Sequence, residues 1–202
     1  MKFTNRYMLL YSAALVAAVA VVLALVALWL KPLQERNIAI EQQQMVLRAA
    51  GLDVPSSEVE TLYNQHIREV NLLDDASMPA YLFDSQCIIP VRGTGLWGPI
   101  WGYLCFDSTW TVTGAVFDHK GETPGLGGEI ASPQFAQRFI GKRVVDDLGK
   151  QLIPIRLKKH ADPRSLYEVD AISGGTMTSN GVSEMLQVGL NHYKDYILQQ
   201  KI

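Results

Sequence analysis

Two stretches of the sequence carry residue types that could bind or hold a small molecule. The first, DAISGGTMTSNG at residues 170–181, places hydroxyl side chains among three glycines. The second, DHKGETPGLGGEI at residues 118–130, places Glu122 and Thr123 among four glycines. No G-x-S-x-G elbow or Ser/His/Asp arrangement is visible in the sequence, so both stretches point to binding or attachment rather than to hydrolysis.

The stretch at residues 170–181 has two interpretations. A final helix is expected from about Asn180, and Thr178, Ser179 or Asn180 could cap it by accepting a backbone hydrogen bond. Thr176 lies further out and is not needed for capping. A helix N-terminus also favours an anion, and the two glycines before Thr176 leave room around its hydroxyl. Thr176 could therefore hold a phosphate group covalently.

The stretch at residues 118–130 is also open to two interpretations. Its glycines expose bare backbone N–H and C=O groups that a flat ligand could approach, and Glu122 and Thr123 could add directed polar contacts. A wide surface turn is the alternative, and the spacing alone favours it.

Several other functions are not supported. GTGLWG at residues 93–98 matches the glycine pattern of dinucleotide sites, but Pro99 begins a strand-like run where that site needs a helix. The four histidines lack the spacing of metal ligands, so no metal site is predicted. The formal net charge is -2, which argues against a nucleic-acid partner.

The N-terminus contains an uncharged apolar run at residues 7–30. As a helix it would reach roughly 36 Å, enough to cross a hydrocarbon core of about 30 Å. A cleaved signal peptide is the alternative, but its apolar region would be shorter. Lys2 and Arg6 have no acidic neighbours, whereas the cations after the run are matched by glutamates. We expect a cytoplasmic tail at 1–6, a transmembrane helix at 7–30 and an extracytoplasmic domain at 31–202.

The rest of the chain predicts an α+β fold, in which the transmembrane helix is followed by a mixed domain with an antiparallel sheet. Helices are expected at 34–50, at 57–70 from a capping box of the form S-x-x-E, at 132–141 and from about 180; strands are expected at 80–91, 99–106, 109–118, 152–157 and 166–172. Cys87 and Cys105 lie in two of these apolar strands. Buried free thiols are expected there, with a disulfide as the alternative.

Both glycine-rich stretches resemble those of one family. The sequence DAISGGT at residues 170–176 is similar to the flavin-attachment motif D-x-x-S-G-A-T of the C subunit of the sodium-translocating NADH:quinone oxidoreductase, with Gly175 in place of the alanine. GETPGLGGEI at 121–130 and GTGLWGPIWGYL at 93–104 match two further landmarks. The chain is similar, less closely, to the G subunit of the Rnf electron-transport complex. The resemblance covers nearly the whole chain.

This resemblance implies a covalently bound cofactor. FMN would be attached through a phosphoester to Thr176 by a flavin transferase, with Thr178 as the alternative attachment residue. Trp97 or Leu126 would lie against the flavin ring. The remaining expected contacts are at the ring's polar edge and beside the attachment point: Glu122, Thr123, Gly125, Gly127, Ser173 and Gly174.

The resemblance also implies a function. The chain would be an electron-transfer subunit in an inner-membrane complex that oxidises NADH, reduces quinone and pumps Na⁺, with its main domain on the periplasmic side. Other subunits of that complex would be its partners, and NADH would bind elsewhere. Two alternatives remain, namely the G subunit of an Rnf-type ferredoxin:NAD complex and a flavin-free membrane-anchored scaffold.

Overall fold

The computed structural model describes residues 5–199. Its first helix, α1 (Asn5–Ala49), is the one helix in this range that is long and apolar enough to cross a membrane by length and composition. Residues 1–4 of the expected cytoplasmic tail lie outside the described range. The chain divides after Gln42 into a helical unit and a compact domain. The helix expected at 34–50 is confirmed as a continuation of the apolar run, and it ends before Gly51, whose φ is 86°.

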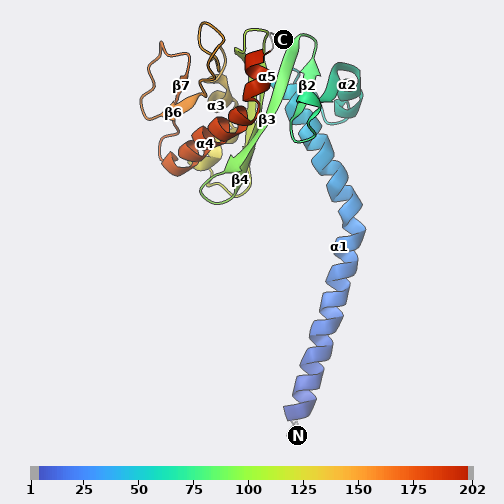
Figure 1. The fold of residues 1–202 in the computed structure, drawn as a ribbon. Helices are drawn as coiled ribbons and strands as arrows, with labels where there is room; N and C mark the ends of the chain where they lie inside the picture. The colour runs from blue at the N-terminus through green and yellow to red at the C-terminus, as the bar shows by residue number, and fades with distance from the viewer. Residues whose placement is uncertain (1–4, 200–202) are drawn as a thin grey trace. The chain divides into compact units, whose positions relative to one another are not determined.

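The domain is built on a five-stranded antiparallel sheet in which consecutive strands are neighbours (Figure 1). Its strands are β1 (Ile67–Asn71), β2 (Pro79–Phe83), β3 (Gln86–Thr94), β4 (Pro99–Phe106) and β5 (Val112–His119). This confirms the antiparallel sheet expected from the runs rich in aromatic and β-branched residues. The single strand expected at 80–91 is two strands, because Asp84 adopts a φ of 50° in the turn between them.

The helix expected at 57–70 is wrong in its second half. The helix α2 covers only Val59–His66, and Glu58 at its N-cap makes no side-chain capping bond. Residues after His66 form β1 instead, with Ile67 opposite Phe83 and Val70 opposite Ala80. Pairing with β2 therefore overrides the local helical signal, since a strand gains its stability from a partner that is distant in sequence.

Different elements cover the two faces of the sheet. On one face lies the main core, which includes α3 (Pro133–Gln137), α4 (Thr176–His192) and α5 (Lys194–Gln199), and Figure 1 shows α4 running alongside β3. The other side meets the C-terminal end of α1. A Cβ atom at Gly114 of β5 would overlap the Ala49 carbonyl oxygen, so this glycine allows strand and helix end to touch. The last turns of α1 are buried.

The final helix differs from expectation at both ends. It begins at Thr176 rather than near Asn180, with Gly175 as N-cap, and it breaks at Tyr193 into α4 and α5. The expected apolar stripe is nevertheless buried throughout: Val182, Leu186, Leu190, Tyr193 and Ile197. The apolar stripe determines which face of the helix packs against the core. The position at which the helix begins depends instead on the loop that precedes it.

The remaining expected elements are shorter than the sequence suggested. Ser132 caps α3 by accepting a bond from the Phe135 N–H, but the helix stops at Gln137. The strands expected at 152–157 and 166–172 reduce to β6 (Arg156–Lys158) and β7 (Glu168–Asp170), which pair in parallel. Short 3₁₀ turns occur at η1 (Leu72–Asp74) and η2 (Gly127–Ala131).

The two cysteines are free and buried, as expected. Cys87 lies opposite Phe106 in the β3–β4 ladder, whereas Cys105 lies opposite Ile88. Because successive residues of a strand point to opposite faces, the two thiols lie on opposite sides of the sheet. The disulfide alternative is therefore wrong.

Candidate functional site

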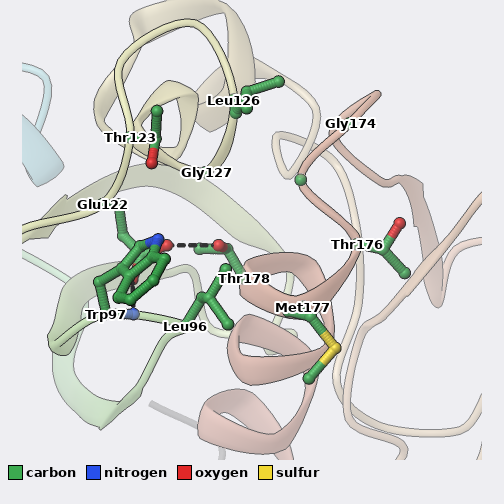
Figure 2. A pocket seen from close by; sticks show the side chains of 11 residues that line it. Leu96, Trp97, Glu122, Thr123, Leu126, Gly127, Gly174, Thr176, Met177 and Thr178 are labelled. Carbon is green, nitrogen blue, oxygen red and sulfur yellow. Dashed lines mark hydrogen bonds between the residues drawn. The ribbon is translucent and has the colours of Figure 1, made fainter.

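A pocket forms where three loops meet (Figure 2). They are the turn between β3 and β4, the glycine-rich loop after β5 and the start of α4. Its volume is about 150 Å³. Small-molecule sites usually enclose roughly 300–1,000 Å³, so this pocket can hold only part of a ligand as large as a flavin. Its lining residues are Leu96, Trp97, Glu122, Thr123, Leu126, Gly127, Gly174, Gly175, Thr176, Met177 and Thr178.

Glu122 connects the three loops. Its side chain is buried, with 3% of its surface exposed. Oε1 accepts a hydrogen bond from the Trp97 N–H at 2.8 Å, and Oε2 accepts one from Thr178 Oγ1 at 2.5 Å. The Glu122 N–H donates to Nδ1 of His119 at 3.2 Å. Both carboxylate oxygens of Glu122 thus accept hydrogen bonds from other pocket loops and hold these loops together.

Two opposing effects act on the charge of Glu122. Burial raises its pKa, because a carboxylate loses hydration in the interior. The hydrogen bonds from Thr178 and from the backbone N–H groups of Trp97 and Gly98 lower it by more, so the net pKa lies below its ordinary value. Glu122 therefore carries a negative charge at neutral pH, in the wall of the pocket.

Glycines allow the loops to approach this closely. A Cβ atom at Gly95 would lie 2.6 Å from Oε1 of Glu122, and one at Gly127 would lie 2.5 Å from Oε2. Gly174 has a φ of 74°, and a Cβ there would lie 2.7 Å from Cδ2 of Leu126. A larger residue at any of these positions would push the loops apart.

The start of α4 presents free donors. The N-cap Gly175 accepts a bond from the Ser179 N–H at 2.9 Å, so the N–H groups of residues 176–178 have no acceptor within the helix. The expectation that Thr178, Ser179 or Asn180 would cap the helix is wrong, since all three lie inside it. The buried Ser179 hydroxyl instead accepts a bond from the Ile172 N–H at 3.0 Å, which fixes the preceding loop.

Thr176 and a group of apolar side chains surround the pocket. Thr176 is the first residue of α4 and is exposed, and it lies across the pocket from Trp97 in Figure 2. Trp97 is 69% exposed and Met177 is 60% exposed, and Leu96 and Leu126 are about half exposed. Large apolar side chains grouped around one opening are a common mark of a binding site.

Most of the expected site residues meet here. Seven of them line the pocket: Trp97, Glu122, Thr123, Leu126, Gly127, Gly174 and Thr176. Gly125 and Ser173 are not among the lining residues, although each is next to one in the chain. Sequence reasoning missed Leu96 and Met177. No local pattern marks either residue, because each lines the pocket only once the loops have met.

The comparison with family models gives the class of protein. The FMN-binding domain family matches residues 95–191, which include every residue that lines the pocket. The region that forms the site is therefore similar to an FMN-binding domain.

Whole-chain comparisons narrow this class. The C subunit of the Na(+)-translocating NADH-quinone reductase of Pseudomonas aeruginosa is 32% identical over 230 aligned positions, covering 87% of each chain. Its counterpart from Vibrio vulnificus is 29% identical, with 81% of this chain and 82% of the relative covered. The chain belongs to the family formed by the C subunits of the Na⁺-translocating NADH-quinone reductases.

Solved structures agree with this assignment. The crystal structure of the C subunit from Parabacteroides distasonis superimposes with a TM-score of 0.75 at 34% identity, covering 86% of this chain and 98% of that one. NqrC of Shewanella oneidensis shares the fold, with a TM-score of 0.63 at 24% identity over 78% of this chain and 96% of that one. The α+β fold with an antiparallel sheet is therefore confirmed.

Proposed function

We propose that this chain is the FMN-carrying electron-transfer subunit of a membrane complex that oxidises NADH, reduces quinone and pumps Na⁺, with FMN joined to Thr176 by a phosphoester. The observation that carries the proposal is the meeting of Thr176, the free N–H groups of α4 and an exposed apolar surface in one pocket. The names of the relatives supply the complex.

The residues present fit the two halves of FMN. The exposed Thr176 hydroxyl and the N-terminus of α4 suit a phosphate, which the helix dipole favours. Trp97 and Leu126, with Leu96 and Met177, offer apolar surface to the ring. Bound FMN supplies one- and two-electron redox chemistry.

The polar contacts divide between two roles. Thr123 and the backbone of the loop that holds Gly125 and Gly127 are available to the polar edge of the ring, and Ser173 and Gly174 lead into the attachment residue. Glu122 is already bonded to Trp97 and Thr178. The proposed role of Glu122 is therefore to hold Trp97 in place and to keep a negative charge close to the flavin.

A small, open pocket is suited to an electron carrier. Because its volume is small, much of a bound flavin would stay exposed to partners. The covalent bond would then retain the cofactor where the pocket alone cannot. Retention matters for a domain outside the cytoplasm, since a lost flavin could not readily be replaced there.

The proposed membrane topology is based on α1. Residues 7–30 would span the inner membrane with the N-terminus in the cytoplasm, and residues 31–202 would lie on the periplasmic side. The partners would be the other subunits of the complex and the flavin transferase. The names of the relatives favour this complex over an Rnf-type assembly.

The test uses the full chain from membranes that contain an active flavin transferase. A denaturing gel viewed under ultraviolet light should show a fluorescent band, and tandem mass spectrometry should place FMN on Thr176. Thr176→Val should abolish the band, whereas the matched Thr176→Ser keeps a hydroxyl and should retain at least part of it. FMN on Thr178 would move the site but keep the function. A dark wild-type band would overturn the proposal and favour the scaffold.

A further inference from the structure

A tight turn leads into the residue to which FMN would be attached. The Gly175 N–H donates to the Ile172 carbonyl at 3.1 Å, which closes a four-residue turn at residues 172–175. We call it the attachment turn. Its third residue, Gly174, has a φ of 74°, a conformation that glycine adopts readily. Figure 2 shows Gly174 in the segment that leads to Thr176. The position of Thr176 therefore depends on how the attachment turn is held.

Ser179 binds both ends of the attachment turn. Its hydroxyl oxygen accepts the Ile172 N–H at 3.0 Å, and its own N–H donates to the Gly175 carbonyl at 2.9 Å. Ser179 is buried, with 2% exposed, and a hydrogen bond in such a low-dielectric place is stronger than in water. Ser179 also lies three residues after Thr176, and residues at this spacing are neighbours on a helix surface. One buried serine thus fixes the attachment turn beside Thr176.

Arg138 holds the chain just before the attachment turn. Its Nη1 donates to the Asp170 carbonyl at 2.8 Å and to the Ala171 carbonyl at 3.3 Å. The guanidinium lies over the Phe135 ring, 5.4 Å from the ring centroid, and Phe135 is completely buried. The attachment turn is therefore held from α4 by Ser179, while the residues before it are held from the end of α3 by Arg138.

The first turn of α4 is fixed from a second direction as well. The Thr178 hydroxyl donates to Oε2 of Glu122, and Thr178 is buried, with 1% exposed. Successive residues of an α-helix point about 100° apart, so the Thr178 and Ser179 side chains form their bonds in different directions. Rotation of this helical turn would break at least one of the two bonds. The exposed Thr176 is therefore presented by a turn of helix that cannot rotate.

We propose that Ser179 and Arg138 are positioning residues, which give FMN attached to Thr176 a single orientation at the pocket. The presence of FMN rests on the proposed function, whereas the held turn rests on the hydrogen bonds above. The pocket has a volume of only about 150 Å³, so it encloses too little of a flavin to orient it alone. The orientation must then come from the attachment point. A flavin attached in this way would move with the domain and not within it.

The chain offers a matched control for Ser179. Ser183 lies one helical turn further along α4, and its hydroxyl oxygen accepts the Leu157 N–H at 2.9 Å. This bond is of the same kind as the bond between Ser179 and Ile172, but it joins α4 to β6 and not to the attachment turn. Loss of the Ser183 hydroxyl should therefore lower the stability of the domain without moving Thr176.

Amide hydrogen exchange tests the held turn without flavin. The full chain, produced without a flavin transferase and kept in detergent, is compared with its Ser179→Ala and Ser183→Ala variants. Ser179→Ala should speed exchange of the Ile172 amide at least about tenfold, because a buried N–H loses its acceptor, and should leave the Leu157 amide unchanged. Ser183→Ala should have the reverse effect. Equal exchange of the Ile172 amide in all three proteins would overturn the inference.

Visible circular dichroism of the flavinylated chain tests the orientation of the flavin. The isoalloxazine ring is itself achiral, so a strong visible signal requires protein groups fixed around it. The dichroism is divided by the flavin absorbance, so that the yield of attachment does not affect the comparison. Ser179→Ala should lose most of this signal and approach free FMN, whereas Ser183→Ala should keep the signal of the wild type. Equal signals in the two variants would overturn the inference.

Substitution of Arg138 tests the second contact at an exposed position, where folding is not at risk. Arg138→Met removes the donor to the Asp170 and Ala171 carbonyls and should lower the flavin dichroism, by less than Ser179→Ala does. Both bonds come from one nitrogen atom, so Arg138→Lys should restore most of the signal.

The matched control for Arg138 is Arg164→Met, at an exposed arginine outside the pocket, and it should leave the dichroism unchanged. Thermal unfolding identifies any variant that fails to fold. If Ser179→Ala does not fold, the Arg138 variants decide the question, because equal dichroism in Arg138→Met and Arg164→Met would contradict the inference.

The fluorescent flavin band keeps this test separate from that of the proposed function. A fluorescent wild-type band, with the same flavin dichroism in Ser179→Ala and Ser183→Ala, overturns the positioning inference alone. A dark wild-type band overturns the proposed function, and amide exchange then decides whether Ser179 holds the attachment turn.

Discussion

Glu122 and Thr178 are 56 positions apart in the sequence and share a hydrogen bond of 2.5 Å in the wall of the pocket. The bond ties the loop after β5 to the first turn of α4. The other carboxylate oxygen of Glu122 accepts the Trp97 N–H, so one buried side chain fixes both ends of the pocket. The shape of the site therefore depends on a residue whose carboxylate is already bonded within the protein.

Removing the Thr178 hydroxyl should destabilise the domain. Thr178→Val leaves a buried carboxylate oxygen without its donor, and we expect a loss of about 1–3 kcal/mol in the free energy of unfolding. Urea unfolding measures the loss. Thr176→Val is the matched control at an exposed position, and it should change stability by less than about 0.5 kcal/mol. Equal losses in both variants would contradict the role given to the Glu122–Thr178 bond.

Stability should fall in acid through Glu122. Its pKa in the folded state is held below the ordinary value of 4.5, so between these two values the unfolded chain binds more protons than the folded one. The contribution of Glu122 is therefore complete above about pH 5 and is lost as the pH falls through the folded pKa.

Comparison with Glu122→Gln isolates this contribution, because other carboxylates such as Asp107 and Asp146 also have lowered pKa values. Unfolding free energies measured from pH 7 to pH 3 should differ most between the two proteins near neutrality and converge in acid. Curves that stay parallel over this range would show that Glu122 does not titrate differently on folding.

The two glycines before Thr176 should respond differently to alanine. Gly174→Ala places a Cβ at a φ of 74° and against Leu126, and should cost about 1–2 kcal/mol. Gly175 has a φ of -109° and a ψ of 41°, outside the left-handed region, and its Cβ would lie 3.0 Å from Cγ2 of Ile172, a close contact. Gly175→Ala should therefore destabilise the domain less than Gly174→Ala does, and thermal or urea unfolding of the two variants measures the difference.

Flavin attachment provides a second readout for this pair. Gly175→Ala restores the alanine of the motif D-x-x-S-G-A-T, so the yield of fluorescent protein should equal or exceed that of the wild type. Gly174→Ala should lower the yield. The reverse order would show that Gly175 gives the loop a freedom that attachment needs.

The thiols should be unreactive in the folded protein. Burial raises the pKa of Cys87 to about 12 and also raises that of Cys105, so little thiolate forms at pH 8. Alkylation should be slow until the chain is unfolded, and then both cysteines should react without prior reduction. Reaction of both only after a reducing agent is added would indicate a disulfide and contradict the sheet register.

Sequence patterns predicted the parts of the fold that depend on periodicity. The strands β3, β4 and β5 follow from their apolar runs, and the buried stripe of α4 and α5 follows from its helical spacing. The start of α4 and the strand β1 did not follow, because both depend on tertiary partners. Ser179 bonds back to Ile172, and β1 exists only by pairing with β2.

The sequence allowed individual site residues to be predicted, but not the hydrogen bonds that connect them. The glycine-rich motifs located Glu122, Thr123 and Thr176, because glycines mark the places where backbones approach closely. The hydrogen bond between Glu122 and Thr178 could not be predicted, since no local spacing relates them. Leu96 and Met177 were missed for the same reason, as each lines the pocket only once the loops have met.

The burial of the last turns of α1 determines where a water-soluble version of this protein can begin. Met45, Val46, Leu47 and Ala49 belong to the domain, and the Gln44 side chain donates to the Val54 carbonyl at 3.1 Å. A truncation at Gly51 would expose the surface that these residues cover, and loss of each large side chain costs about 2–5 kcal/mol. A truncation before Gln43 removes the apolar run and leaves the domain's internal contacts complete.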